Sequence, residues 1–304
     1  MMRKIFPFLF LAAAAVSVCA GGILFYSRHQ EETRRQMDLR QRRQAWEDLR
    51  RQAWGEIRRF QGEAGVVIED LDTGWVMGHQ HDRVFASASL VKVPLMVACY
   101  QAAREGRIRL SDTITLRGSD KVSGSGSLKA KPSGSRFTVE ELIGRMITES
   151  DNTATNMLIR ALGYDYLNGS FRRIGLQNTT LVRRMMDFSQ RKNGVENLTT
   201  PSDVASVFRQ LYSFRLVSEE ASKECLEFLM NQTKNDRIPA GLPPQTVVAH
   251  KTGLEKGVCH DSGIVFTPKG NLLICVLTEN GKASPPAKKF IARLASLAYK
   301  YKTE

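Results

Sequence analysis

The apolar and polar positions divide the chain into three stretches. Residues 5–26 carry no charge and are mostly apolar, residues 27–44 are rich in Arg, Gln and Glu, and an amphipathic pattern begins at Trp46. A helix that rises about 1.5 Å per residue crosses a hydrocarbon layer of about 30 Å within the length of the first stretch. We therefore expect a membrane anchor at 5–26, a charged linker at 27–44 and one folded domain over 45–304.

Within the expected domain, apolar residues recur either every three or four positions or in short runs. From Trp46 to Phe60 they share one helical face. Short apolar runs predict strands at 64–70, 75–77, 246–250, 263–266 and 272–277. We expect further helices near Ser89 and at 138–148, 153–162, 201–213, 218–231 and from 285 onward. Strands at both ends with helices between them predict an α/β sandwich with a helical insertion.

The first stretch has an alternative interpretation as a secretory signal peptide. Small residues around Cys19 and Ala20 would allow cleavage after Ala20. The apolar run nevertheless continues to Tyr26, beyond such a cut. We therefore favour an uncleaved anchor that holds the domain outside the cytoplasm, in a periplasm or on the cell surface, with secretion after cleavage as the alternative.

The composition is that of an ordinary globular protein, with 304 residues, 42% hydrophobic and 25% charged. The formal charge of +13 can favour nucleic acid, anionic lipid or an anionic cell-wall polymer. Zinc spacings, recognition-helix signatures and interleaved aromatic and basic residues are missing from the sequence, so we expect no nucleic-acid partner. The five cysteines lack metal-ligand spacing, which indicates buried thiols or at most one disulfide. We expect a monomer without metal or cofactor.

The first candidate for chemistry is Ser89-Leu-Val-Lys92. Residues three apart on a helix share a face, so the lysine amine can reach the serine hydroxyl. A serine becomes a good nucleophile when a neighbouring base takes its proton. The apolar residues 93–96 favour a desolvated lysine of lowered pKa. Ser189 and Lys192 have the same spacing in a polar stretch, and we take that match as accidental.

The second motif is Ser150-Asp-Asn152, which begins 61 residues after Ser89. Ser150 can relay a proton to a leaving nitrogen, and the Asn152 side chain can hold a substrate amide. The alternative is structural, because Ser and Asp at this point would cap the following helix equally well.

The third motif is Lys251-Thr252-Gly253, which begins 101 residues after Ser150. Its cation and hydroxyl can bind a substrate carboxylate, and glycine lets an acyl chain lie against the backbone. The alternative is that these three residues simply finish a strand.

Together, the three motifs in this order resemble the set found in class A β-lactamases and penicillin-binding proteins. The resemblance covers about residues 45–304 and includes the loop 121–128 and the stretch 260–265. It implies a three-layer sandwich, in which helices flank an antiparallel sheet of about five strands, and a mainly helical subdomain. It also implies that Ser89 forms an acyl-enzyme and that the backbone N–H groups of Ser89 and Leu254 bind the oxyanion.

The sequence departs from this family in the loop 184–197. Class A β-lactamases carry there a glutamate that activates water to release the acyl group, and Met186 stands in its place when the loops are aligned from their start. Asp187 is the nearest carboxylate and our candidate general base, although it can instead pair with the preceding arginines or cap a turn. An arginine that many members use to grip the substrate carboxylate is also missing between residues 253 and 267.

The resemblance leaves three functions to distinguish. The first is a serine β-lactamase-like hydrolase that opens β-lactam or related amide bonds through acyl-Ser89. The second is a penicillin-binding D,D-carboxypeptidase or endopeptidase that acts on peptidoglycan stem peptides and releases β-lactams slowly. The third is a membrane-bound β-lactam sensor, which we rank last because only four residues precede the apolar run.

Overall fold

The computed structural model describes residues 6–279 and 284–303, with side chains for 28–279 and 285–303. Its contacts divide the chain into two compact units, Met1–Arg51 and Gln52–Glu304. Helix α1 (Phe6–Arg59) forms the described part of the first unit and the start of the second, and the predicted linker is an exposed part of this helix. No helix among the residues with described side chains is long and apolar enough to cross a membrane. The predicted anchor at 5–26 lies outside those residues.

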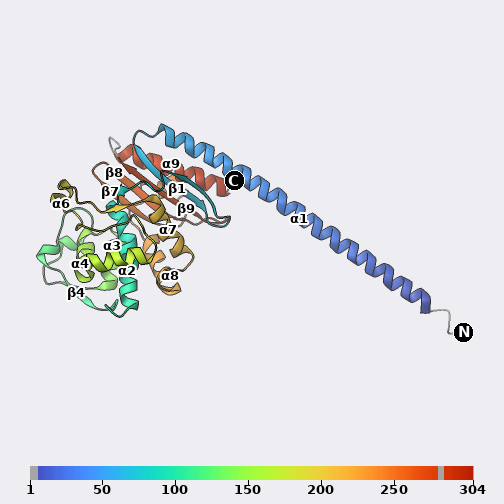
Figure 1. The fold of residues 1–304 in the computed structure, drawn as a ribbon, viewed down its shortest axis with the longest axis horizontal. Coiled ribbons are helices and arrows are strands. Elements are labelled where there is room, and N and C mark those ends of the chain that lie inside the picture. The colour runs from blue at the N-terminus through green and yellow to red at the C-terminus, as the bar shows by residue number, and fades with distance from the viewer. Residues whose placement is uncertain (1–5, 280–283, 304) are drawn as a thin grey trace. The chain divides into compact units, whose positions relative to one another are not determined.

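The second unit is built on a five-stranded antiparallel sheet with the strand order β2-β1-β9-β8-β7 (Figure 1). The two ends of the domain meet where β1 pairs with β9 along the whole length of both strands. This arrangement confirms the predicted α/β fold. The strands of the sheet are β1 (Glu63–Asp70), β2 (Trp75–His79), β7 (Val248–Glu255), β8 (Val258–Val265) and β9 (Leu272–Glu279).

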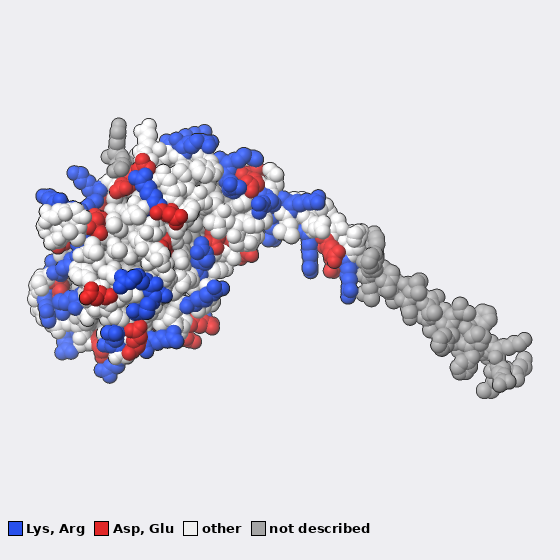
Figure 2. Space-filling view, viewed as in Figure 1, with Lys and Arg blue, Asp and Glu red and all other residues white. Residues whose placement is uncertain are grey.

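Helices cover both faces of the sheet, α9 on one and α7 with α8 on the other (Figure 1). The main apolar core joins the inner face of the sheet to the helices between the second and the seventh strand. Acidic and basic side chains are mixed over the face seen in Figure 2, which spreads the positive charge of this unit. The helices of this unit after α1 are α2 (Lys92–Arg104), α3 (Val139–Thr148), α4 (Asn152–Leu162), α5 (Tyr164–Arg173), α6 (Phe188–Lys192), α7 (Pro201–Tyr212), α8 (Glu219–Met230) and α9 (Ser284–Thr303).

Short elements connect these helices and strands. Two small antiparallel pairs, β3 with β6 and β4 with β5, are separate from the main sheet. One 3₁₀ turn lies before α2, two lie between β4 and β5, and one lies before β7. These elements are β3 (Phe85–Ala86), η1 (Ala88–Val91), β4 (Thr113–Thr115), η2 (Gly118–Asp120), η3 (Leu128–Ala130), β5 (Arg136–Thr138), β6 (Leu198–Thr199) and η4 (Pro239–Gly241).

The helices of the insertion begin where the sequence supplies a capping side chain. Thr138 and Glu141 form a capping box at the start of α3, and Asp151 caps α4 by accepting the Ala154 N–H. The starts and ends of α3, α4, α7 and α8 confirm the predicted helices to within a residue or so. Helix α5 escaped prediction because it is mostly polar and buries only Leu167, Ser170 and Phe171.

Strands β7 and β8 extend well beyond the predicted apolar runs. The expected strands at 246–250 and 263–266 overlap β7 and β8, which pair along their whole length from Val248↔Val265 to Glu255↔Val258. The prediction that residues 251–253 finish a strand was therefore wrong, because they lie inside β7. Cross-strand hydrogen bonds extend both strands through polar residues that an apolar-run rule does not detect.

A buried ion pair locks the end of α9 to the turn between β1 and β2. Lys302 Nζ lies 2.8 Å from Asp70 Oδ1 and 2.8 Å from Asp72 Oδ2, and Tyr301 donates to Asp70 Oδ2 at 2.6 Å. The side chains of Lys302 and Asp70 are 5% and 1% exposed. The pKa of Asp70 is lowered overall. Burial alone would raise it, but the hydrogen bonds from Lys302 and Tyr301 have the larger combined effect.

Lys302→Met is expected to lower the free energy of unfolding by about 3–5 kcal/mol, because Asp70 then stays buried without its cation. Urea denaturation followed by circular dichroism measures the change. Arg109→Met is the control, because Arg109 is 83% exposed in its pair with Asp112, and it should cost under about 1 kcal/mol. Equal losses of unfolding free energy in the two variants would contradict the stabilising role given to the buried pair of Lys302 and Asp70.

Candidate active site

The candidate nucleophile lies in the turn that joins β3 to α2. Ser89 is half-buried in η1, and Lys92 begins α2 with a fully buried side chain. Ala88 has a left-handed backbone with φ 44°, which is strained for a residue that carries a Cβ. A Cβ on Gly253 would lie 3.2 Å from the Ala88 Cβ. Glycine at position 253 therefore lets β7 pass close to the serine turn.

Lys92 connects the first motif to the second. Its Nζ donates to the Ser150 carbonyl oxygen at 2.7 Å, to Asn152 Oδ1 at 2.8 Å and to Ser150 Oγ at 3.2 Å. These bonds hold the amine beside Ser150, and Ser89 lies one turn earlier in the chain, in η1. The first two motifs therefore meet in the folded chain.

Lys251 brings the third motif to the same hydroxyl. Its fully buried Nζ donates to Ser150 Oγ at 2.9 Å and to the Thr252 carbonyl oxygen at 3.1 Å. Ser150 has a left-handed backbone with φ 56°, an uncommon conformation that places its hydroxyl between the two lysines. All three predicted motifs thus converge on one side chain.

Burial lowers the pKa of both lysines. Desolvation and then the nearby Lys251 cation bring the pKa of Lys92 well below its ordinary value, although Asp151 and Glu255 oppose this. Desolvation also lowers the pKa of Lys251 to about 7, with Asp261 opposing the change and Arg237 adding to it. A lysine of lowered pKa loses its proton more readily, and its free amine can then act as a general base.

Met186 lies beside the amide of Asn152. The Asn152 side chain donates to the Ser123 carbonyl at 3.3 Å, and Gly124 follows with φ 84°. A Cβ on Gly124 would lie 2.8 Å from Asn152 Nδ2 and 3.2 Å from Met186 Sδ. An apolar thioether therefore borders the site next to a predicted substrate-binding amide.

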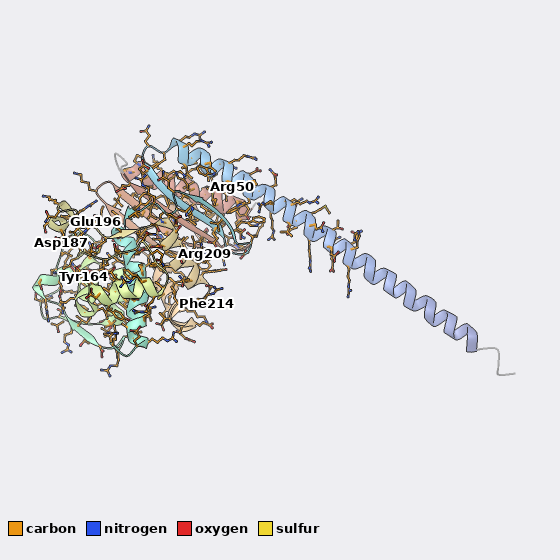
Figure 3. All side chains as sticks on the ribbon, viewed as in Figure 1. Arg50, Tyr164, Asp187, Glu196, Arg209 and Phe214 are labelled. Carbon is orange, nitrogen blue, oxygen red and sulfur yellow. The ribbon has the colours of Figure 1, made fainter. Side chains whose placement is uncertain are left out.

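Asp187 caps the short helix α6 (Figure 3). Its Oδ1 accepts from Ser189 Oγ at 2.7 Å and from the Gln190 N–H at 3.2 Å. These two hydrogen bonds are the main reason why the pKa of Asp187 is lowered. The carboxylate thus makes the capping contacts that the sequence offered as its alternative role, and its role as a general base stays a prediction.

Asparagine side chains clamp the loop that carries Met186. Asn156 of α4 holds the backbone of Met185, accepting its N–H at 2.9 Å and donating to its carbonyl at 3.3 Å. Asn197 closes the neck of the loop by accepting the N–H groups of Val182 at 2.8 Å and Arg183 at 3.0 Å.

A charged network ties the same loop to the end of β7. Arg183, whose side chain is 1% exposed, lies 2.6 Å from Glu196 and 3.3 Å from Glu255. Arg191 pairs with the same two acids at 3.0 and 2.8 Å. Figure 3 labels Asp187 and Glu196 near one another at this end of the domain. The loop and the lysine-bearing strand are therefore held in a fixed relation.

The other predicted residues follow Lys251 along β7. Thr252 and Gly253 are buried and pair with residues of β8, whereas the Leu254 side chain is 49% exposed. Because β7 is an edge strand of the described sheet, its outer backbone groups are available to a ligand. Oxyanion binding by the Leu254 N–H stays a prediction.

Arg237 was missed by sequence reasoning. It is 2% exposed, donates from Nε to Cys259 Sγ at 3.2 Å and contributes to the lowered pKa of Lys251. The sequence lacks an arginine between residues 253 and 267, and Arg237 brings a guanidinium to Cys259 of β8 from an earlier segment. No spacing rule connects Arg237 to Lys251, so only the fold reveals their proximity.

The structure describes four cysteines as buried free thiols, and Cys19 lies outside the described side chains. No group of three or more His, Cys, Asp or Glu among the described residues can hold a metal ion. The four thiols are Cys99, Cys225, Cys259 and Cys275.

Comparison with known proteins decides the family. Residues 46–302 match the model of the Beta-lactamase enzyme family. The chain belongs to this family. It is therefore a class A β-lactamase-like serine hydrolase, as its three motifs predict.

Relatives and solved structures agree with this assignment. The β-lactamase FAR-1 of Nocardia farcinica is 29% identical over 78% of this chain and 76% of its own length. PBP-A is 30% identical with a TM-score of 0.77, covering 83% of this chain and 95% of that chain, and a mutant of it was solved as an acyl-enzyme complex with penicillin G. A β-lactamase from Sphaerobacter thermophilus is 32% identical with a TM-score of 0.77, covering 85% of this chain and 98% of its own.

Proposed function

We propose that this protein opens β-lactam or related amide bonds through an acyl-enzyme on Ser89. The observation that carries the proposal is the pair of buried amines on Ser150 Oγ, Lys92 at 3.2 Å and Lys251 at 2.9 Å. Membership of the family and the penicillin G acyl-enzyme of the similar protein PBP-A support the same reaction.

In the proposed acylation, neutral Lys92 takes the proton of Ser89 while the serine oxygen attacks the carbonyl carbon. The lowered pKa of Lys92 makes the neutral amine available. The N–H groups of Ser89 and Leu254 stabilise the oxyanion, and each such donor is typically worth about 3–4 kcal/mol. Ser150 then gives its proton to the leaving nitrogen and recovers one from Lys92, so the C–N bond breaks and Lys92 is neutral again.

The substrate would be held by residues of β7 and by a residue at the start of α4. Lys251 and Thr252 would bind its carboxylate, and the guanidinium of Arg237 adds positive charge to the same region. Asn152 would hold an amide of the substrate with the side chain that also contacts Lys92.

Ser89→Ala is expected to abolish covalent labelling by a fluorescent penicillin, because the variant lacks the attacking oxygen. Gel fluorescence and intact-protein mass spectrometry measure the adduct.

Ser189→Ala is the matched control, because Ser189 has the same three-residue spacing to a lysine on exposed helix α6. It should label like the wild type. Labelling that persists in Ser89→Ala would remove Ser89 from the mechanism.

We also propose that the acyl-enzyme is released slowly. Met186 offers a thioether that cannot take a proton from water, and Asp187 would have to leave the α6 cap to do so. Slow release favours, as a second candidate function, a penicillin-binding D,D-peptidase that acts on peptidoglycan stem peptides. The likeness to PBP-A supports this candidate.

Met186→Glu is expected to speed release of the penicilloyl group by at least about tenfold, because a positioned general base contributes about 10²–10⁴-fold. The loss of the adduct mass after a chase with unlabelled penicillin measures the rate.

Met186→Gln keeps the length and polarity of the new side chain without the base, and it should release the adduct at the wild-type rate. Asp187→Asn should also leave the rate unchanged if Asp187 only caps α6. Equal rates for the Glu and Gln variants would contradict the role given to position 186.

We propose that residues 5–26 anchor the protein in a membrane, with the catalytic domain outside the cytoplasm. The stretch holds 22 uncharged residues, and helix α1 begins at Phe6. A wall-directed substrate would also lie on that side.

Spheroplasts that express the C-terminally tagged chain are expected to lose the tag to added protease, and carbonate washing should leave the intact chain in the membrane. A tag protected in intact spheroplasts would place the domain inside the cell. A secreted product that starts after Ala20 would favour signal cleavage instead.

A further inference from the structure

His260 of β8 is a fully buried side chain that the proposed mechanism does not use. Its Nε2 lies 2.8 Å from the Ala86 carbonyl oxygen of β3, and its Nδ1 lies 3.0 Å from the Thr278 backbone nitrogen of β9. A carbonyl oxygen only accepts a hydrogen bond and a backbone N–H only donates one, so Nε2 carries the ring proton and Nδ1 is the acceptor. Burial lowers the pKa of His260 to about 4, in keeping with this neutral ring.

The His260 ring lies on the sheet face that carries the Lys251 side chain. Gly253 pairs with His260 across β7 and β8, and residues that face each other in a sheet, or stand two apart on one strand, point to the same face. A Cβ on Gly253 would lie 3.2 Å from His260 Cδ2 and 3.2 Å from the Ala88 Cβ. The Phe85 ring meets the imidazole edge-on, with the ring centroids 6.3 Å apart. The imidazole is therefore packed where the strand that leads to Ala88 crosses the sheet.

Hydrogen bonds fix the serine turn, which comprises residues 86–91 and contains Ser89. The Ser87 N–H donates to the Asn197 carbonyl at 2.7 Å, and the Ser87 carbonyl accepts the Leu90 N–H at 3.0 Å. Asn197 and Leu90 both lie outside the five-stranded sheet. The bond from His260 to the first residue of the turn is the one that fastens this backbone to the sheet.

The proposed oxyanion hole joins the same two parts of the chain. Its first donor, the Ser89 N–H, lies on the serine turn, and its second, the Leu254 N–H, follows Gly253 on β7. Donors of this kind act when they lie about 2.7–3.1 Å from the developing oxyanion, and a misplacement of about 1 Å costs about 10²-fold in rate. A side chain that fixes the turn against the sheet accordingly controls the spacing of the two donors.

We propose that His260 is a positioning residue that fastens the serine turn to the sheet through the Ala86 carbonyl and so aligns the two oxyanion donors for acylation. The effect on acylation rests on the proposed function. The hydrogen bond to Ala86 is a property of the free protein and is measured without any substrate.

Two conservative variants separate the two hydrogen bonds of the ring. In His260→Gln the amide nitrogen takes the place of Nε2 and keeps the donor for Ala86. In His260→Asn the amide oxygen takes the place of Nδ1 and keeps the acceptor for Thr278, but the shorter side chain no longer reaches Ala86. A purely structural role of the histidine gives no reason for these two variants to differ in catalysis when both are folded.

The first experiment follows the carbonyl carbon of Ala86 by NMR in protein labelled with ¹³C at the alanine carbonyl, assigned by its loss in Ala86→Gly. The signal should shift in His260→Asn, because the carbonyl loses its donor, and should stay near its wild-type position in His260→Gln. An unmoved signal in His260→Asn would overturn the proposal.

The second experiment measures penicillin acylation by quenched-flow mass spectrometry over a range of penicillin concentrations, which separates the acylation rate constant from the dissociation constant of the first complex. His260→Asn should lower the rate constant by about 10–100-fold and leave the dissociation constant unchanged, because only the transition state uses the aligned donors. His260→Gln should acylate close to the wild-type rate. A folded His260→Gln with the wild-type Ala86 signal and a large loss of rate would overturn the proposal by itself.

Leu211→Ala is the control for lost stability, because Leu211 is a fully buried residue of α7 outside the three motifs. It should lower the melting temperature and leave the acylation rate constant unchanged at a temperature where every variant is folded. Rate constants that follow the melting temperature across the three variants would overturn the proposal and leave His260 a structural role. A wild type that is never acylated, with the Ala86 signal behaving as expected, would overturn the proposed function and leave the fastening of the turn intact.

Discussion

The site depends on the removal of water from two amines that share one hydroxyl. An unpaired charge costs several kcal/mol to bury, so each lysine must find hydrogen bonds or an opposite charge. Lys92 finds them in Ser150 and Asn152, and Lys251 finds them in Ser150 and the Thr252 carbonyl. In an interior of low dielectric constant, the positive charge on one lysine also disfavours the charged form of the other. The reactivity of the site therefore follows from desolvation more than from any unusual residue.

The fold supports these groups on separate rigid elements. Lys92 lies on α2, Ser150 between α3 and α4, and Lys251 on β7. Each group is therefore held in place by the packing of a different element. Left-handed backbones at Ala88 and Ser150 lie inside this framework. Strain of this kind persists where the surroundings over-determine the conformation, and it commonly marks sites that need exact side-chain placement.

Sequence patterns predicted the helices and strands well, but they did not predict the residues that surround the two lysines. Helical periodicity and capping residues located α3 and α4, and the three motifs identified the side chains that meet at Ser150. The length of β7 escaped because its continuation is polar. Arg237 escaped because it reaches this region only through the fold and acts on Lys251 through its charge, which leaves no spacing signal in the chain.

Gly124 has a consequence for how this site can diversify. Its left-handed backbone and missing Cβ leave just enough room for the Met186 thioether beside Asn152. Methionine and glutamate have side chains of similar length, so an exchange at position 186 alters the polarity of the neighbourhood with little demand on its volume. A larger residue at 124 would instead push the whole loop outward. Because residue 124 is glycine, a single exchange at position 186 can be accommodated. That exchange would separate an enzyme with a long-lived acyl-enzyme from one that hydrolyses it rapidly.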